Sequence, residues 1–404
     1  MKTFLKQLLC VILAGNTALS LCACGCDDKP KTEPSDTTAV QTTNSTNNTT
    51  QVNTTIPDNA TTDQIPSMPT LNHNKIKQDA ESIEARFNTI LKSHNFMGTI
   101  YYKIGNDFEY IGNNGFSNED THTYNSINTD YYIGSLTKQF TAVAIMLLQE
   151  EGKLSTSDTL DKYFPEYEYG SEITIRHLLT MTDGIPDYLN KENELTKNNT
   201  RVCDVDSDNS YDQNHDIIIN WILSQDLVGE YEEYNYSNSG YYLLGDIIEK
   251  VSSEKYDDYI KNHILDPIGM CNTGFEKTDM LAIPYRNVHD NYWTTYNGVG
   301  YSSVGMISNI GDMLKWTDAL CGEEFLSIKS KEELFTPYKS DFACGFFVND
   351  MGIYNNDTSF YSFNSTQYFS YEKSLIFFAF SNYSQNDLAI VKAEFDKVIE
   401  EYII

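Results

Sequence analysis

Ser135 and Lys138 form the residue pair in this chain whose types and spacing point most directly to chemistry. A serine hydroxyl becomes a good nucleophile when a neighbouring base removes its proton. A lysine amine can be that base when burial lowers its pKa. A spacing of three residues places both side chains on one face of a helix. The pair therefore predicts attack by Ser135 on an acyl group, with Lys138 as the activating base.

The surroundings of this pair distinguish it from a chance occurrence of the same pattern. Ser-x-x-Lys also occurs at Ser252 and Lys255, where the neighbouring residues are polar. That second copy is typical of a solvated turn. The copy at Ser135 instead opens a run, 139–152, that is apolar on most faces and ends in Gly152, a residue that often stops a helix. We therefore expect Ser135 at the start of a buried helix.

A second candidate element is Tyr236-Ser237-Asn238, which leads straight into another apolar helical pattern. A phenol beside a cation can take part in proton transfer. The simpler interpretation is that Tyr236 is a core contact and Asn238 a helix cap. Tyr-x-Asn also occurs at Tyr285 and at Tyr354, so the motif alone favours the simpler interpretation.

Together these elements resemble the serine β-lactamase and penicillin-binding-protein superfamily, in its class C-like serine hydrolase branch. The resemblance covers about residues 75–404. It is carried by five groups of residues in a fixed order, with sensible gaps between them. These are 96–98 with 115–116, 132–142, 173–186, 236–238, and 305–308 with 311–316.

The resemblance assigns a role to each candidate residue. It implies that Ser135 is acylated, that Lys138 and Tyr236 share the proton transfers, and that Asn238 binds the substrate amide and steadies Lys138. The Ser135 backbone N–H would belong to the oxyanion hole. The implied substrate is a small acyl compound or a peptide, with cell-wall fragments among the candidates, and neither a metal nor another cofactor is expected.

The chain departs from this family at the third motif, where a strand facing the nucleophile carries Lys or His, a small residue and Gly. Counting back from the extended run 374–380 places this motif near Ser362, Phe363 and Asn364. These residues supply a hydroxyl and an amide but no cation. The second oxyanion N–H is then expected from the same strand, at Ser365.

This departure leaves alternative functions open. The intact Ser135, Lys138 and Tyr236 favour an active hydrolase of esters or amides that lack a terminal carboxylate. The altered strand favours a degenerate member that binds a wall fragment or peptide without turnover. A surface spacer or adhesion role is a third interpretation. Met181 and Asp183 stand where the family has His and Ser, and we expect these changes to be tolerated.

The elements that must position these residues predict an α+β fold. Apolar residues at helical spacing predict a helix over 76–91, and the runs 97–103 and 108–112 predict a hairpin. An extended run at 374–380 and a helix over 388–399 close the chain. We expect an antiparallel sheet built from both ends, flanked by the terminal helices, with an inserted helical subdomain.

The first 74 residues predict export and anchoring. Lysines precede an apolar stretch over 8–18 that is too short to span a bilayer, and the residues that follow resemble a bacterial lipobox. We expect a signal peptide over 1–24, lipidation of Cys24 and a disordered Thr/Asn-rich tether over 25–74. The protein would be lipid-anchored to the outer face of the bacterial cytoplasmic membrane. The alternative is an ordinary cleaved signal peptide with incidental thiols.

The charge and the cysteine content argue against nucleic-acid binding, lipid binding by charge, and zinc or redox sites. The chain carries 28 Lys+Arg against 58 Asp+Glu, a formal net charge of −30, so it lacks the basic surface that nucleic acids or anionic lipids require. Because no later segment approaches transmembrane length, we expect a lipid chain to be its sole membrane anchor. Four cysteines of the body show neither paired CxxC spacing nor an accompanying His cluster, which argues against a zinc or redox site. Buried free thiols are favoured, and disulfides stay open; the residues are Cys203, Cys271, Cys321 and Cys344.

Overall fold

The computed structural model describes residues 70–189, 205, 208–228, 232–285, 297–349, 352–372 and 374–404. The predicted signal peptide, Cys24, Cys203 and nearly all of the predicted tether lie outside these residues. Within the described part of the chain, no helix has both the length and the apolar character to cross a membrane. Cys344 is a buried free thiol, as expected, whereas Cys271 is free but exposed.

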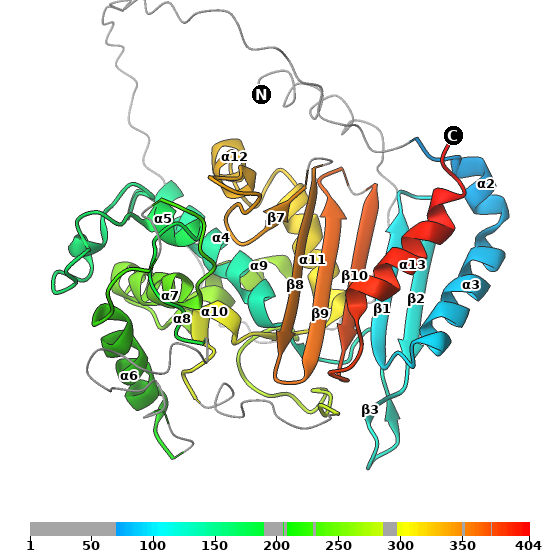
Figure 1. Cartoon of the computed structure of the whole chain (residues 1–404), viewed down its shortest axis with the longest axis horizontal. Helices are drawn as coiled ribbons and strands as arrows, with labels where there is room; N and C mark the ends of the chain where they lie inside the picture. Colours follow the sequence, from blue (N-terminus) through cyan, green and yellow to red (C-terminus); the bar gives the residue numbers. More distant parts are fainter. Residues whose placement is uncertain are drawn as a thin grey trace, which may run out of the picture. The chain divides into compact units, whose positions relative to one another are not determined.

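A six-stranded antiparallel sheet takes its strands from both ends of the chain (Figure 1). The central strand β10 is buried along its whole length because helices cover both of its faces. The hairpin predicted near the N-terminus is confirmed by the pairing of β1 with β2. In spatial order the strands are β2 (Phe108–Asn114), β1 (Gly98–Ile104), β10 (Leu375–Ser381), β9 (Phe363–Ser370), β8 (Ile353–Phe360) and β7 (Phe347–Val348).

The terminal helices cover one face of this sheet, as predicted (Figure 1). The rings of Phe87 and Phe395 stack with centroids 3.7 Å apart and tie the first helical segment to the last. The single helix predicted over 76–91 is divided at Asp79, whose backbone (φ −97°, ψ 8°) leaves the helical conformation. These helices are α2 (His73–Gln78), α3 (Ala80–Ser93) and α13 (Leu388–Glu400).

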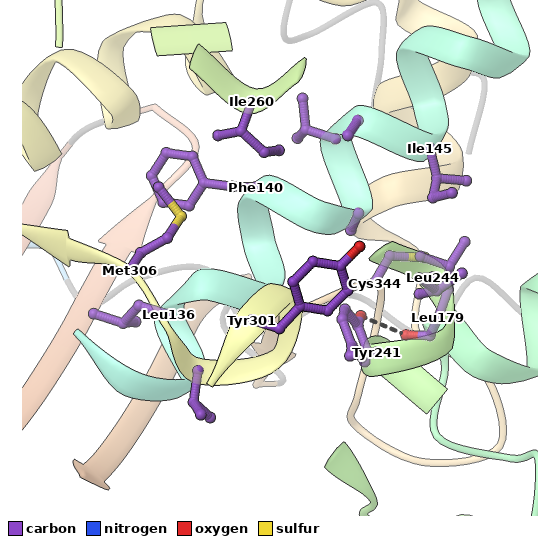
Figure 2. Packing of buried hydrophobic residues seen from close by; sticks show 14 of the residues in the cluster. Leu136, Phe140, Ile145, Leu179, Tyr241, Leu244, Ile260, Tyr301, Met306 and Cys344 are labelled. Carbon is purple, nitrogen blue, oxygen red and sulfur yellow. Dashed lines mark hydrogen bonds between the residues drawn. The ribbon is translucent and has the colours of Figure 1, made fainter. Parts of the chain in front are cut away.

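A helical subdomain is inserted between β2 and the C-terminal strands, as expected. Its central helix α4 (Thr137–Glu150) packs against α7, α8, α10 and α12 and is buried on almost every side, which explains its continuous apolar sequence. Figure 2 shows Phe140 and Ile145 of α4 among side chains from the surrounding elements. The main surrounding helices are α5 (Ile175–Leu179), α6 (Tyr211–Leu223), α7 (Asn238–Ser252), α8 (Tyr256–Ile260), α10 (Tyr301–Val304), α11 (Ile310–Cys321) and α12 (Ile328–Phe335).

Short elements complete the fold. Two small two-stranded sheets flank the main sheet, and one of them joins the residues before Ser135 to the segment after α10. The strands are β3 (Phe116–Asn118), β4 (Thr123–Tyr124), β5 (Tyr131–Tyr132) and β6 (Ile307–Ser308). The short helices are η1 (Gly134–Leu136), η2 (Leu160–Lys162), the π-helix η5 (Lys261–Leu265) and α9 (Asp266–Ile268).

Candidate active site

Ser135 lies in the short helix η1, directly before α4. Gly134 enters this turn with φ +51°, a left-handed conformation that a side chain would strain. Lys138 follows in the first turn of α4, and its Nζ lies 3.1 Å from Ser135 Oγ. The second Ser-x-x-Lys copy has no such geometry, because Lys255 is largely exposed and pairs with the carboxylates of Asp212 and Glu249. Of the two Ser-x-x-Lys copies, only the one at Ser135 therefore has the geometry of a nucleophile beside a buried lysine.

Lys138 is fully buried, and its amine contacts two groups that can only accept hydrogen bonds. Nζ donates to Asn238 Oδ1 at 2.7 Å and to the Ser303 carbonyl oxygen at 2.9 Å. Burial lowers the pKa of Lys138 to about 7, although the negative charge of Asp187 raises it in part. A neutral amine has two N–H groups and one lone pair. Because the two acceptors use both N–H groups, the lone pair points to the Ser135 hydroxyl and can take its proton.

Tyr236 reaches the same serine from the segment that precedes α7. Its phenolic oxygen lies 2.7 Å from Ser135 Oγ. Burial raises the pKa of Tyr236 well above its usual value, and the hydrogen bond to Ser135 offsets only part of this rise. The phenol therefore keeps its proton and can donate it toward Ser135 Oγ, and when the Lys138 amine is neutral the serine hydroxyl can donate to Lys138. Within the free site, Lys138 rather than Tyr236 is the group ready to accept a proton.

Asn238 is held in one orientation by Asp187. The side-chain Nδ2 of Asn238 donates to both carboxylate oxygens of Asp187, at 3.1 and 3.0 Å, which leaves Oδ1 to face Lys138. The helix-cap interpretation of Asn238 is not what the structure shows, because Ser237 is the N-cap of α7 and accepts from the Ser239 N–H. Asn238 is instead the first residue of α7, and its side chain points to the lysine.

Met181 supports the segment that carries Tyr236. Its sulfur accepts from the Ser237 N–H at 3.4 Å and its carbonyl oxygen from the Asn235 N–H at 2.8 Å. Asp183 in the same loop accepts from the Ile185 N–H at 2.8 Å, and burial raises the pKa of its carboxyl to about 7. Both side chains are fully buried, so these residues are accommodated as structural parts of the loop.

The strand that faces the nucleophile was predicted in the wrong place. Ser362 lies in the turn between β8 and β9, and Asn364 on β9 bonds the carbonyl oxygens of residues 383, 384 and 386, away from Ser135. Ser365 is also on β9, and its hydroxyl donates to the Tyr132 carbonyl oxygen. β8 lies beside Ser135 instead. The count along the sequence failed because it stopped at β9, one strand short of β8.

Two side chains of β8 contact the Ser135 backbone. Thr358 Oγ1 accepts from the Ser135 N–H at 3.1 Å. Asn356 Nδ2 donates to the Ser135 carbonyl oxygen at 3.3 Å and to that of Gly345 at 3.4 Å. Asn356 belongs to the Tyr354-x-Asn356 copy, which no sequence pattern singled out. The strand residues nearest the nucleophile thus supply an amide and a hydroxyl, with no cation anywhere along β8.

The sequence analysis did not identify four residues of the site, namely Asp187, Ser303, Asn356 and Thr358. Asp187 directly follows the loop segment that ends at Pro186, but no spacing rule connects it to Asn238. Ser303 acts through its backbone carbonyl, which carries no side-chain signature. The two β8 residues replace a recognisable motif with residue types that are common on any strand. Only the fold brings these groups into the site around Ser135 and Lys138.

Comparison with known proteins supports the same family. A family model described as "Beta-lactamase" matches residues 98–398. The chain is 33% identical over 311 residues to "Putative penicillin-binding protein PbpX" of Bacillus subtilis (strain 168), covering 74% of each chain. It is 31% identical over 281 residues to "Penicillin-binding protein 4*" of the same strain, covering 64% of this chain but only 59% of that protein.

Solved structures show the same fold. A penicillin-binding protein from Bacillus halodurans aligns with a TM-score of 0.66 at 25% identity, covering 77% of this chain and 99% of that one. A class C beta lactamase from Rhodobacter sphaeroides aligns with a TM-score of 0.60 at 18% identity, covering 80% and 99%. These matches agree with the antiparallel sheet and the helical subdomain. The chain therefore belongs to the beta-lactamase family of serine hydrolases, which also includes penicillin-binding proteins.

Proposed function

We propose that this protein hydrolyses an ester or amide through an acyl-enzyme on Ser135. The observation that carries the proposal is the arrangement of three side chains around one oxygen. Ser135 Oγ lies 3.1 Å from the Lys138 amine and 2.7 Å from the Tyr236 phenol. The nucleophile thus has a base on one side and a proton donor on the other, which is the arrangement that acyl transfer requires.

Acylation follows from the protonation states at the site. Lys138 takes the Ser135 proton, and Oγ forms a bond to the acyl carbon of the substrate. The carbonyl oxygen becomes negatively charged and is stabilised by backbone N–H donors, among them that of Ser135. When the intermediate collapses, the leaving group takes the phenolic proton of Tyr236. The resulting phenolate lies beside the Lys138 ammonium, whose charge stabilises it.

Deacylation restores the same groups. The Tyr236 phenolate takes a proton from a water molecule, whose oxygen attacks the acyl carbon. The bond from the acyl carbon to Ser135 Oγ breaks, and Lys138 returns its proton to that oxygen. The acid product leaves, and the amine, phenol and hydroxyl regain their starting forms. No atom or charge has to come from outside the substrate, the water and these three side chains.

The charges near Ser135 favour substrates without a terminal carboxylate. β8 carries no cation. The carboxylate of Asp187 contacts Asn238, and Asn238 in turn contacts Lys138. A substrate carboxylate beside β8 would find no positively charged side chain of that strand to pair with. We propose neutral or amine-bearing acyl compounds and peptides, including fragments of the cell wall, as the substrate class.

We also propose that the protein acts outside the cytoplasm, anchored by a lipid on Cys24. The predicted signal peptide and tether support this location, and the acidic composition suits a protein held near, but not bound to, an anionic surface. Radioactive palmitate should label the full chain in a bacterial host, and the label should be lost in Cys24→Ala. Labelling that persists in this variant would exclude Cys24 as the anchor.

A binding role without turnover is the second candidate. The contact between Thr358 and the Ser135 N–H favours it, since that N–H is a donor that the transition state needs. The two candidates are separated by measuring hydrolysis of paired p-nitrophenyl esters, one with and one without a terminal carboxylate. The hydrolase predicts turnover of the neutral ester, weaker turnover of its carboxylate partner, and none in Ser135→Ala. A folded wild-type protein that turns over neither ester would support the binding module.

A further inference from the structure

The backbone N–H of Ser135 already has a hydrogen-bond partner in the free protein. Thr358 Oγ1 accepts from it at 3.1 Å. An oxyanion donor in a working site lies about 2.7–3.1 Å from the oxygen that it stabilises. The threonine hydroxyl therefore occupies the point, relative to this N–H, at which the carbonyl oxygen of a substrate would have to lie.

The side chain of Thr358 reaches this point because it lies against Gly134. A Cβ atom at position 134 would lie 2.5 Å from Thr358 Oγ1 and 3.1 Å from the Cβ of Phe360. The side chain of Thr358 thus lies against the glycine that precedes the nucleophile, in space that any larger residue at 134 would fill. The left-handed φ of +51° at Gly134 and this close approach both require glycine.

A second contact fixes the strand itself. Asn356 precedes Thr358 by two residues, so both side chains lie on the same face of β8. The Asn356 amide donates to the Ser135 carbonyl oxygen at 3.3 Å, while Thr358 accepts from the Ser135 N–H. Both polar groups of the Ser135 backbone are therefore bound by one strand. At position 358 of β8, a residue without a side chain would leave the Ser135 N–H open to a substrate.

We propose that the Thr358 hydroxyl closes the oxyanion position of the resting site and must be displaced by the carbonyl oxygen of the substrate before acylation. This inference rests on the proposed hydrolase function. Thr358 is half-buried, so its side chain can rotate about the Cα–Cβ bond without moving the strand. Acylation of Ser135 is then slowed by the need to exchange one hydrogen bond for another, and Thr358 acts as a positioning residue that sets its rate.

The test compares substitutions of Thr358 and of its neighbour Ser359 by the rate at which an activated p-nitrophenyl ester acylates the full chain. Thr358→Ala removes the blocking hydroxyl and should acylate about tenfold faster, the factor that corresponds to the loss of one ordinary hydrogen bond. Thr358→Val fills the same space and should not be faster than wild type. Ser359→Ala, the next residue and an exposed one, is the matched control and should leave the rate unchanged.

Two outcomes overturn the proposal. A Thr358→Ala variant that is acylated no faster than wild type would mean that the hydroxyl does not close the site. A slow Thr358→Ala together with a normal Thr358→Ser would show that the hydroxyl assists the reaction instead. Both results leave the hydrolase function intact, because wild-type protein is acylated in each.

Hydrogen exchange at the Ser135 amide gives a readout that needs no acyl chemistry. The amide should exchange slowly in wild-type protein and in Ser359→Ala, and faster in Thr358→Ala, with thermal unfolding used to show that all three are folded. Equal exchange in wild type and Thr358→Ala would overturn the proposal even if the ester assay succeeded. If no variant is acylated, the proposed function fails, and the exchange rates still decide whether Thr358 covers the Ser135 N–H.

Discussion

Asp187 fixes the orientation of Asn238, since both of its carboxylate oxygens accept from the Asn238 amide, at 3.1 and 3.0 Å. A carboxylate can only accept, so the Asn238 oxygen must point the other way, to Lys138 Nζ at 2.7 Å. The direction of the lysine lone pair toward Ser135 depends on this contact. A residue outside the known motifs thus sets the geometry of the nucleophile's base.

Asp187→Ala should slow acylation of Ser135 by about tenfold or more, because Asn238 loses the partner that holds its oxygen toward Lys138. Asp187→Asn should retain much of the rate, since its amide oxygen still accepts from Asn238. Both variants should shift the pH midpoint of acylation downward, because the charge of Asp187 raises the pKa of Lys138. Asp212→Ala, whose side chain is 78% exposed on α6, is the control. An unshifted midpoint in both variants would remove Asp187 from the site.

The acylation rate should rise with pH and level off above about pH 7. Burial lowers the pKa of Lys138 from 10.5 to about 7, so the amine is protonated below this pH and free above it. The rate should therefore fall about tenfold for each pH unit below the midpoint. Stopped-flow acylation from pH 5 to about pH 9 measures this. A rate that is flat over this range, or that falls as the pH rises, would contradict Lys138 as the base.

Tyr236→Phe should lower turnover by a factor on the order of 10²–10⁴, the usual contribution of a positioned proton donor. The fold should be unaffected because the ring, which packs near Phe342, is retained. Tyr234→Phe makes the same chemical change two residues earlier and should leave turnover near the wild-type value. Equal losses in the two variants would mean that the phenol of Tyr236 has only a structural role.

Gly134→Ala should destabilise the protein more than Gly152→Ala, although both glycines have positive φ, +51° and +70°. A Cβ at Gly152 meets nothing within 4 Å, whereas a Cβ at Gly134 meets Thr358 Oγ1 at 2.5 Å. We expect a loss of about 1 kcal/mol in the free energy of unfolding for Gly152→Ala and about 2–4 kcal/mol for Gly134→Ala. Urea unfolding measures both. Equal losses would show that only backbone strain matters at Gly134.

The sequence predicted those parts of the fold and site that depend on local pattern. The buried helix after Ser135, the hairpin near the N-terminus and the last helix each follow from periodicity, and the pairing of Ser135 with Lys138 follows from helical spacing. Family motifs then related Tyr236 and Asn238 to this pair across a gap in sequence that no local pattern can cross.

The parts that the sequence did not predict depend on contacts between distant segments. The position of the third motif required the register of β8 against β9, and a count from β10 could not supply it. Asp187 and Thr358 act only through the partners that the fold brings to them. The protonation states of Lys138 and Tyr236 likewise follow from burial, which the three-dimensional structure determines.

The most direct test of the account is to locate the adduct formed by a fluorophosphonate probe on the purified protein. Mass spectrometry of the digested protein should place one adduct on Ser135 in wild type and in a Ser252→Ala control. It should find none in Ser135→Ala, and a much slower reaction in Lys138→Met. An adduct on another serine, or equal rates in wild type and Lys138→Met, would contradict the claim that Ser135 is a nucleophile activated by Lys138.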